Sequence, residues 1–501
     1  MFMKKKIVNG AIILTISGFL CKLFGAFYRI PLASILGAEG LGIYQMIFTV
    51  YSLALVIAGG AIPASMSITI AGMRAKARGD VRKVFRKYFL ISFCFGLLFF
   101  FTFIIFSKQI AAFQGNSLAA RGYFFISFAV LFSSLLAPLR GLFQGYENMT
   151  PTAVSQVIEQ LTKLVFGLSL AFLFVKWGMD GVIGAILGVV LSELFGLIYL
   201  SVRAGTFAKN IKAFDGREVK IGKEYVLILL YVILIPLVNA VDSFLVVNLL
   251  KRNFSPEIAT SLFGIQSGMV NSLINFPIIF SLALSVSLLP SLTYFASKEK
   301  KMEVKKKIND CLNLVWLIIL PCILAFVVLA PIIMQIAYPN LSVELQKTSV
   351  RLLQYSSIQM LFVSLLQVTS SILQASKKSK FLIGNIIVSA SIKVAITAIF
   401  VSTIKFNIFG LVISNITFYF LSSISNLIYL AKIYHLKLNF KNIFVPIALI
   451  LLMSIPCFII EKLGINFMFK ILLLGALGII FYIIPIIYLK IFNFNFVKGK
   501  K

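Results

Sequence analysis

Long apolar runs separated by short polar segments recur along the whole chain. Each run holds roughly 20 apolar residues, enough for a helix to cross about 30 Å of hydrocarbon. Hydropathy predicts fourteen such spans, at residues 11–36, 41–72, 88–106, 119–142, 153–175, 181–202, 224–250, 260–295, 311–337, 348–374, 381–403, 408–431, 443–460 and 467–489. The pattern therefore predicts an all-α polytopic membrane protein.

Three of these spans differ from a simple straight crossing of the membrane. The run at 11–36 follows Lys4–Lys6 as a signal peptide would, but it is too long for the apolar part of one, so we interpret it as the first span. The runs at 41–72 and 260–295 exceed a straight crossing and contain prolines (Pro63, Pro277 and Pro290). We expect bends in both, because proline removes a backbone hydrogen bond from a helix.

Composition agrees with this class of protein. The chain is 60% hydrophobic and 13% charged, with a mean hydropathy of +1.01, and no polar segment is long enough for a soluble domain. The five cysteines are scattered among apolar spans, and His435 is the only histidine. With no phosphate-binding loop either, the sequence predicts no catalytic residues, no metal and no cofactor, hence no enzyme.

The net charge of +31 reflects topology. Thirty-two basic residues fall at the termini and in alternate connections on one side, against ten in the connections on the other side. Cytoplasmic loops carry the excess of lysine and arginine, so both termini are predicted in the cytoplasm, and the chain in the cytoplasmic membrane. The basic excess then faces anionic lipid headgroups, and nucleic acid is not an expected partner.

The chain repeats itself at an offset of 230 residues. LIYL at Leu197–Leu200 recurs at Leu427–Leu430, and the rare polar matches are Gln144 with Gln374, Arg121 with Arg351, and Lys163 with Lys393. Six spans separate the copies, which indicates a parallel repeat of two lobes. The predicted units are an N-terminal lobe at 1–205 (spans 1–6), a C-terminal lobe at 206–437 (spans 7–12), and spans 13–14 with a basic tail at 438–501. We expect a monomer.

Charged residues inside the predicted spans are the candidate functional residues. Each central basic residue facing lipid would cost about 2.5–3.5 kcal/mol, so these side chains should face a wet cavity or charged partners. The candidate cavity cations are Lys22, Arg29, Lys163 and Lys393, and the acids that could pair with them or couple ions are Glu159, Glu193 and Asp242. The alternative is that these residues form ion pairs that only hold helices together.

Spacing suggests particular partners. Glu159 and Lys163 are four residues apart and can pair on one helix face, whereas Arg29 and Asp242 lie at similar depth and could meet. In the repeat, Ser389 replaces Glu159, so Lys393 should be the freer cation. Arg140, Gln144 and Glu147, around the turn between spans 4 and 5, are candidates for a gate or an interface, although Arg140 could equally snorkel to the membrane surface.

Two stretches resemble a known family. RGLFQGYENMTPTAVSQVIEQL (Arg140–Leu161) and FYRIPLASILGAEGLGIYQMIFTVYSL (Phe27–Leu53) are similar to the corresponding segments of the stage V sporulation protein B family. That family belongs with polysaccharide and lipid II flippases in the multidrug/oligosaccharidyl-lipid/polysaccharide exporter superfamily. The resemblance implies a fourteen-span flippase that moves an undecaprenyl-pyrophosphate-linked saccharide outward by alternating access.

Three functions remain open at this point. A flippase for a lipid-linked cell-wall precursor, such as lipid II or a spore-cortex precursor, needs cations to bind its pyrophosphate. A cation-coupled multidrug antiporter needs buried carboxylates, which the basic interior disfavours. A membrane-embedded glycan polymerase needs an acid or base near an ordered outer loop, and the outer connections are short.

Overall fold

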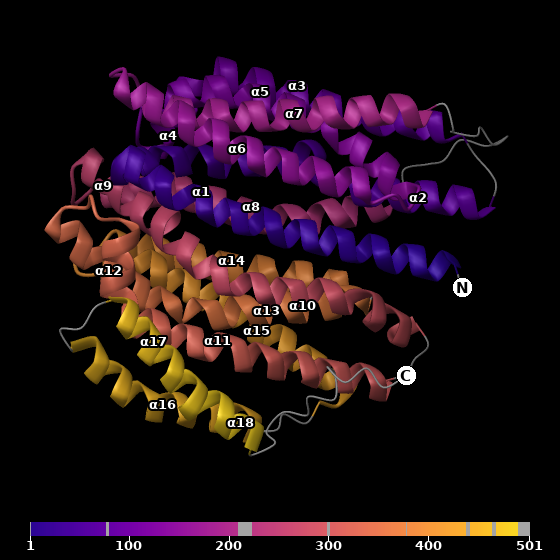
Figure 1. Cartoon of the computed structure of the whole chain (residues 1–501). Coiled ribbons are helices and arrows are strands. Elements are labelled where there is room, and N and C mark those ends of the chain that lie inside the picture. Colours follow the sequence, from indigo (N-terminus) through magenta and orange to yellow (C-terminus); the bar gives the residue numbers. More distant parts are fainter. Residues whose placement is uncertain are drawn as a thin grey trace. The chain divides into compact units, whose positions relative to one another are not determined.

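The computed structural model describes residues 2–76, 80–208, 223–297, 301–376, 378–436, 441–462 and 467–488. Within these ranges the chain is helical and contains no strand, as Figure 1 shows. Eleven helical stretches are long and apolar enough to cross a membrane. The predicted all-α, multi-span fold is confirmed.

The fourteen predicted spans can be traced in these helices. The first apolar stretch, Ile16–Arg74, is 59 residues long and contains the first two predicted spans. Gly37 separates the two within α1 (Phe2–Leu55), because its φ of 69° and ψ of −178° break the helix and suit glycine alone. Ten further stretches match spans 3–12, and two shorter apolar helices, Phe444–Ile460 and Gly475–Ile486, match spans 13 and 14.

The helices divide between two compact units. Unit 1 comprises Met1–Ser272 and Val394–Leu411, and unit 2 comprises Leu273–Lys393 and Val412–Lys501. Unit 1 contains α1, α2 (Ile62–Lys76), α3 (Val81–Ile105), α4 (Ser107–Gln114), α5 (Ala119–Gly145), α6 (Thr150–Lys176), α7 (Gly181–Ala208), α8 (Lys223–Leu250) and α9 (Pro256–Gly264), as well as the π-helices η1 (Val56–Gly60) and η2 (Ile265–Val270).

Unit 2 holds the remaining helices, except that α10, α14 and α15 each also contribute residues to unit 1. They are α10 (Asn271–Ser297), α11 (Lys301–Ala337), α12 (Val343–Ser357), α13 (Gln359–Ala375), α14 (Ser379–Val401), α15 (Phe409–Tyr434), α16 (Lys441–Lys462), α17 (Phe467–Gly478), η3 (Ile479–Ile483) and α18 (Ile484–Tyr488). The lobe bounds 1–205, 206–437 and 438–501 stay a prediction, and the boundary after residue 437 lies outside the described residues, as do the basic residues of 209–222 and 489–501.

Each of the two long runs in which a bend is expected contains a π-helical segment. In the first long run, η1 directly precedes α2, whose second residue is Pro63. A π-helical turn leaves carbonyl groups without their usual partner, and in a bilayer such groups need a donor from the protein. Ser92 Oγ supplies one, because its hydroxyl lies 2.7 Å from Ala58 O and 2.6 Å from Ser134 O and can donate to either carbonyl.

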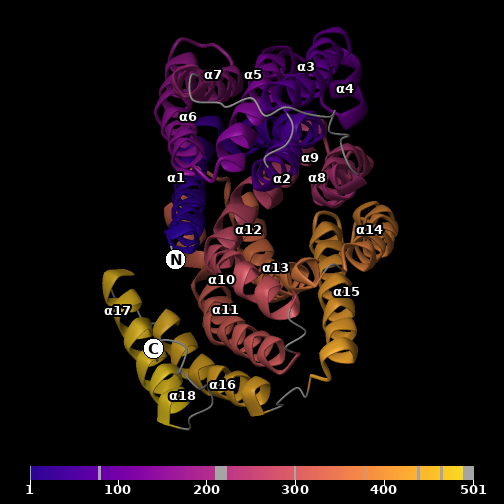
Figure 2. The same cartoon turned by 90° about the vertical axis from the view of Figure 1, so that its right-hand side faces the viewer.

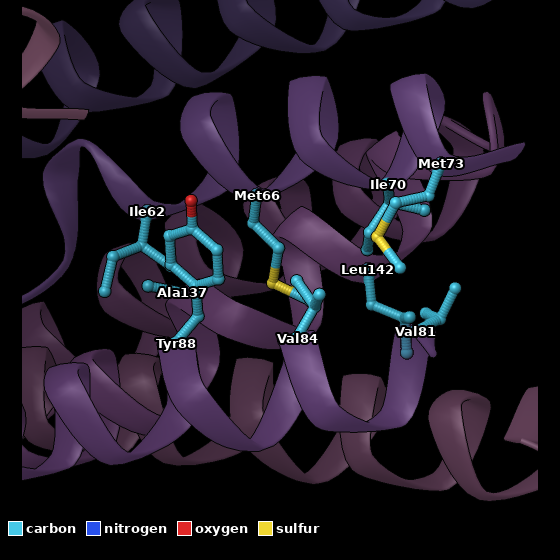
Figure 3. Close-up of a cluster of buried hydrophobic side chains, with 9 residues drawn as sticks. All are labelled: Ile62, Met66, Ile70, Met73, Val81, Val84, Tyr88, Ala137 and Leu142. Atoms are coloured by element: carbon cyan, nitrogen blue, oxygen red, sulfur yellow. The ribbon is translucent and has the colours of Figure 1, made fainter. Parts of the chain in front are cut away.

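A buried apolar cluster beside this bend joins α2, α3 and α5 (Figure 3). Side chains three or four residues apart line one face of each helix, and the cluster comprises Ile62, Met66, Ile70, Met73, Val81, Val84, Tyr88, Ala137 and Leu142. Lipid is as apolar as these side chains, so close packing and polar contacts stabilise such an interface rather than removal from water. Tyr88 and Ser65 provide a polar contact of this kind, with 2.7 Å between their hydroxyl oxygens.

Candidate functional site

Four helices of unit 1 carry most of the charged residues singled out from the sequence. Helix α6 packs along α7 and α1, and α5 packs along α7, which can be followed in Figures 1 and 2. Glycines allow the closest approach: a Cβ at Gly188 of α7 would lie 2.2 Å from the Cα of Gly167 on α6. The glycine-rich run Gly181–Gly188 is therefore packing sequence, which brings the polar faces of these helices together.

Arg140 and Glu159 form an ion pair between α5 and α6. The Arg140 guanidinium donates to both carboxylate oxygens of Glu159, with 2.6 Å between Nη2 and Oε2. The two side chains are only 18% and 10% exposed. Glu159 fits there because Gly196 of α7 leaves room: a Cβ at that position would lie 2.4 Å from Oε1.

This ion pair corrects two expectations. The predicted partner of Glu159 was Lys163, one turn along the same helix, but the structure assigns Arg140 as its partner. Arg140 is also not a residue that snorkels to the membrane surface, since its side chain is mostly buried. Whether it has a gating role stays a prediction.

Glu193 of α7 extends the charged group. Its Oε1 accepts a hydrogen bond from the Tyr51 hydroxyl of α1 at 3.0 Å. Its Oε2 is buried, and the Ser133 hydroxyl of α5 is a further hydrogen-bonding neighbour of the carboxylate. Glu193 also interacts electrostatically with Arg140 and Glu159, so one arginine faces two carboxylates.

Lys163 lies against aromatic rings of α1 and also interacts electrostatically with Glu193 of α7. Its Nζ is 5.0 Å from the ring centroid of Tyr28 and 4.7 Å from that of Phe48. Ammonium groups at these distances are attracted to the ring faces. Tyr28 and Phe48 therefore stabilise the lysine charge without neutralising it.

Arg29 is the second basic residue near this position. It interacts electrostatically with Lys163, and its Nη1 donates to Ser272 Oγ at 3.2 Å. Within the described ranges, neither Arg29 nor Lys163 forms an ion pair. The cluster made of Arg29, Arg140, Glu159, Lys163 and Glu193 is hereafter called the charged cluster.

Lys22, Asp242 and Lys393 are the remaining predicted charged residues. Lys22 of α1 is exposed, and Asp242 of α8 is buried, with 7% of its surface exposed. Lys393 of unit 2 is 1% exposed, and its Nζ is 5.5 Å from the Phe418 ring. Lys393 is thus enclosed beside an aromatic ring, and its role as the freer cation stays a prediction.

Gln144 and Glu147 belong to the turn between α5 and α6. The carbonyl of Gln144 accepts from the backbone N–H of Glu147 at 2.9 Å, and Glu147 has a φ of 59°. Arg74 of α2 secures this turn by donating to Gly145 O at 3.1 Å and by stacking on Tyr146, 4.8 Å from the ring centroid. The predicted turn between these spans is confirmed, and Pro151 lies in the first turn of α6.

Sequence reasoning missed the aromatic part of the site. Tyr44, Phe48 and Tyr51 recur at helical spacing on α1, and Tyr44 stacks on Phe48 with 5.6 Å between ring centroids. That spacing was the available signal, since it places the rings on one helix face. What it could not show is that Lys163 of another helix packs against that face.

This arrangement suits anion binding better than metal binding. The described residues contain no group of three or more His, Cys, Asp or Glu that could hold a metal ion. They do contain an arginine and a lysine without ion-pair partners, beside tyrosines. Such basic groups, partly withdrawn from water, are the usual ligands of phosphate groups.

Comparison with known proteins agrees with the fold. Lipid II flippase MurJ from Bacillus subtilis (strain 168) is 25% identical over 421 residues, which cover 79% of this chain and 77% of that protein. Stage V sporulation protein B from the same organism is 26% identical over 332 residues, covering 62% of each chain. The family model described as "Polysaccharide biosynthesis protein" matches residues 7–295.

Solved structures match over most of the chain. The inward closed conformation of lipid II flippase MurJ superposes with a TM-score of 0.64 at 16% identity, covering 96% of this chain and 99% of that one. An inward-facing multidrug resistance MATE family transporter of the MOP superfamily gives 0.67 at 14% identity, covering 83% and 94%. These relatives are a flippase and a transporter rather than enzymes, and the chain is likewise a multi-pass membrane transporter. The resemblance noted in the sequence is thereby confirmed, and the chain belongs to the polysaccharide biosynthesis protein family.

Proposed function

We propose that this transporter is a flippase for an undecaprenyl-pyrophosphate-linked saccharide, namely lipid II or a related peptidoglycan or spore-cortex precursor. It moves this lipid outward across the cytoplasmic membrane by alternating access, as a monomer. The named relatives support the proposal, because one is a lipid II flippase and another a sporulation protein.

The observation that carries the proposal is the pair of basic residues without ion-pair partners in the charged cluster. Glu159 neutralises the charge of Arg140. By contrast, Lys163 packs against the rings of Tyr28 and Phe48, and Arg29 donates a hydrogen bond to a serine hydroxyl. A pyrophosphate carries two or more negative charges and loses hydration when it leaves water. Basic residues already held in the protein offset that loss by charge-assisted hydrogen bonds.

The orientation follows from charge. Thirty-two basic residues at the termini and in alternate connections place both termini in the cytoplasm under the positive-inside rule. The repeat at 230 residues makes 1–205 and 206–437 the two lobes that alternate, with 438–501 attached. In this scheme the turn with Gln144 and Glu147 lies at the cytoplasmic face, where Arg74 holds it.

A cation-coupled multidrug antiporter is the second candidate. The observation in its favour is Glu193, whose buried carboxylate lies close enough to that of Glu159 to interact with it electrostatically. Such a carboxylate could bind a proton or a sodium ion. A membrane-embedded glycan polymerase is the third candidate, and no contact in the charged cluster favours it.

Reconstitution separates the three functions. The purified chain in liposomes is supplied with fluorescent lipid II in one leaflet, and its arrival in the other leaflet is followed with a membrane-impermeant quencher. Protein-dependent arrival supports the flippase. A parallel assay measures export of ethidium against a proton or sodium gradient. Ethidium export without lipid II movement would support the antiporter instead, and glycan polymer on a gel would support the polymerase.

A further inference from the structure

Unit 2 contains a pocket far in sequence from the charged cluster. Its volume is about 560 Å³, within the range of small-molecule sites. It lies where α11 ends and α12 begins, and it is lined by Pro331, Gln335, Pro339, Leu341, Val343, Gln346, Lys347, Val350, Arg351 and Gln354. The lining combines two basic groups and three amides with an apolar remainder.

The pocket is positively charged. Lys347 and Arg351 are four residues apart on α12, so they share one face of the helix, and both are exposed. Neither forms an ion pair within the described ranges, and no carboxylate lines the pocket. The start of α12, capped by Ser342, adds the positive end of a helix dipole beside Leu341 and Val343.

One lining amide lacks partners. The Nε2 and Oε1 atoms of Gln346 are both buried, and neither has a hydrogen-bond partner among the residues that the structure describes. By contrast, Gln354 donates to Val327 O at 3.0 Å. Buried amide groups are nearly always hydrogen-bonded, because leaving them unpaired costs free energy. These two atoms are closed off from the pocket space, so the charged donors that a ligand in the pocket can reach are those of the exposed Lys347 and Arg351.

We propose that this pocket binds a phosphate-bearing anion. The Arg351 guanidinium offers a fork of donors to two phosphate oxygens, and Lys347 adds a second positive charge. The phosphate could belong to a lipid headgroup, with the apolar side chains of Leu341 and Val350 beside its chains, or to a small soluble anion. The inference rests on residues of unit 2 alone and does not depend on which substrate the charged cluster transports.

Two probes distinguish these sources. Binding of inorganic pyrophosphate to the full chain in neutral detergent is measured by titration calorimetry. Binding of phosphatidylglycerol, against phosphatidylcholine, is counted by native mass spectrometry. The test variant is Lys347→Gln/Arg351→Gln, and both positions are exposed, so the variant should fold. The control is Arg121→Gln, an exposed residue of unit 1 that is the counterpart of Arg351 in the repeat.

The double variant should bind the effective probe at least tenfold more weakly than the wild type, and Arg121→Gln should bind it as the wild type does. Preference for pyrophosphate identifies a small anion, and selective retention of phosphatidylglycerol identifies a lipid headgroup. Equal affinity of the double variant and the wild type, or no saturable binding of either probe up to about 1 mM, would overturn the proposal.

Discussion

The ion pair between Arg140 and Glu159 gives the sharpest test of how the charged cluster is held together. Both side chains are more than four-fifths buried. Replacing Glu159 with methionine keeps the side-chain length but leaves the guanidinium without its counter-charge. Loss of one partner from a buried pair costs about 3–5 kcal/mol, and we expect Glu159→Met to lower the free energy of unfolding by that amount.

The double variant tells whether this cost belongs to the pair. Arg140→Met/Glu159→Met removes both charges, and apolar replacements of buried pairs are often neutral in stability. We therefore expect the double variant to lie within about 1 kcal/mol of the wild type. The coupling energy between the two positions should be at least about 2 kcal/mol. The free energy of unfolding is measured with sodium dodecyl sulfate in bicelles for the wild type, the two single variants and the double variant.

A second double-mutant cycle, between Glu159 and Lys163, provides the control. Glu159 and Lys163 are one helical turn apart, but Lys163 contacts aromatic rings instead. Coupling between Glu159→Met and Lys163→Met should stay below about 0.5 kcal/mol. Strong coupling between Glu159 and Lys163, with weak coupling between Arg140 and Glu159, would refute the ion pair between Arg140 and Glu159. It would instead make Lys163 the partner of Glu159, as the spacing suggested.

Two further substitutions test the surroundings of the carboxylates in the same unfolding assay. Gly196→Ala places a Cβ 2.4 Å from Glu159 Oε1 and should lower the free energy of unfolding by about 1–3 kcal/mol. The control is Gly205→Ala on the same helix, where a Cβ meets nothing within 4 Å, so this variant should be as stable as the wild type. Equal losses of stability in the two variants would contradict the close approach of Gly196 to Glu159. Tyr51→Phe removes the hydroxyl that donates to Glu193 and should cost about 1–3 kcal/mol, so wild-type stability would show that Tyr51 does not hold this carboxylate.

The helices could be predicted from the sequence because a bilayer leaves few choices. Backbone groups in hydrocarbon must be paired within the chain, so each apolar run becomes a helix. Gly37 was not recognised as the break between the first two spans, although the spans themselves were placed on either side of it. The prolines marked the two long runs as irregular, but they did not predict the π-helices η1 and η2 within them.

The contacts within the site were harder to predict, because they depend on how helices rotate against each other. Spacing along α6 made Lys163 a possible partner of Glu159, but Arg140 reaches that carboxylate from α5. The repeat aligned Lys393 with Lys163, yet it said nothing of the Phe418 ring that lies near Lys393. One-dimensional spacing identifies which residues share a helix face, and packing between helices decides what that face meets.

The central claim is that Arg29 and Lys163 bind the pyrophosphate of the transported lipid. Its most direct test is the initial rate of fluorescent lipid II translocation in proteoliposomes that contain equal amounts of folded protein. Arg29→Gln/Lys163→Gln should translocate at least tenfold more slowly than the wild type, whereas Lys176→Gln, an exposed lysine at the end of α6, should match it. A wild-type rate in the double variant would contradict the claim.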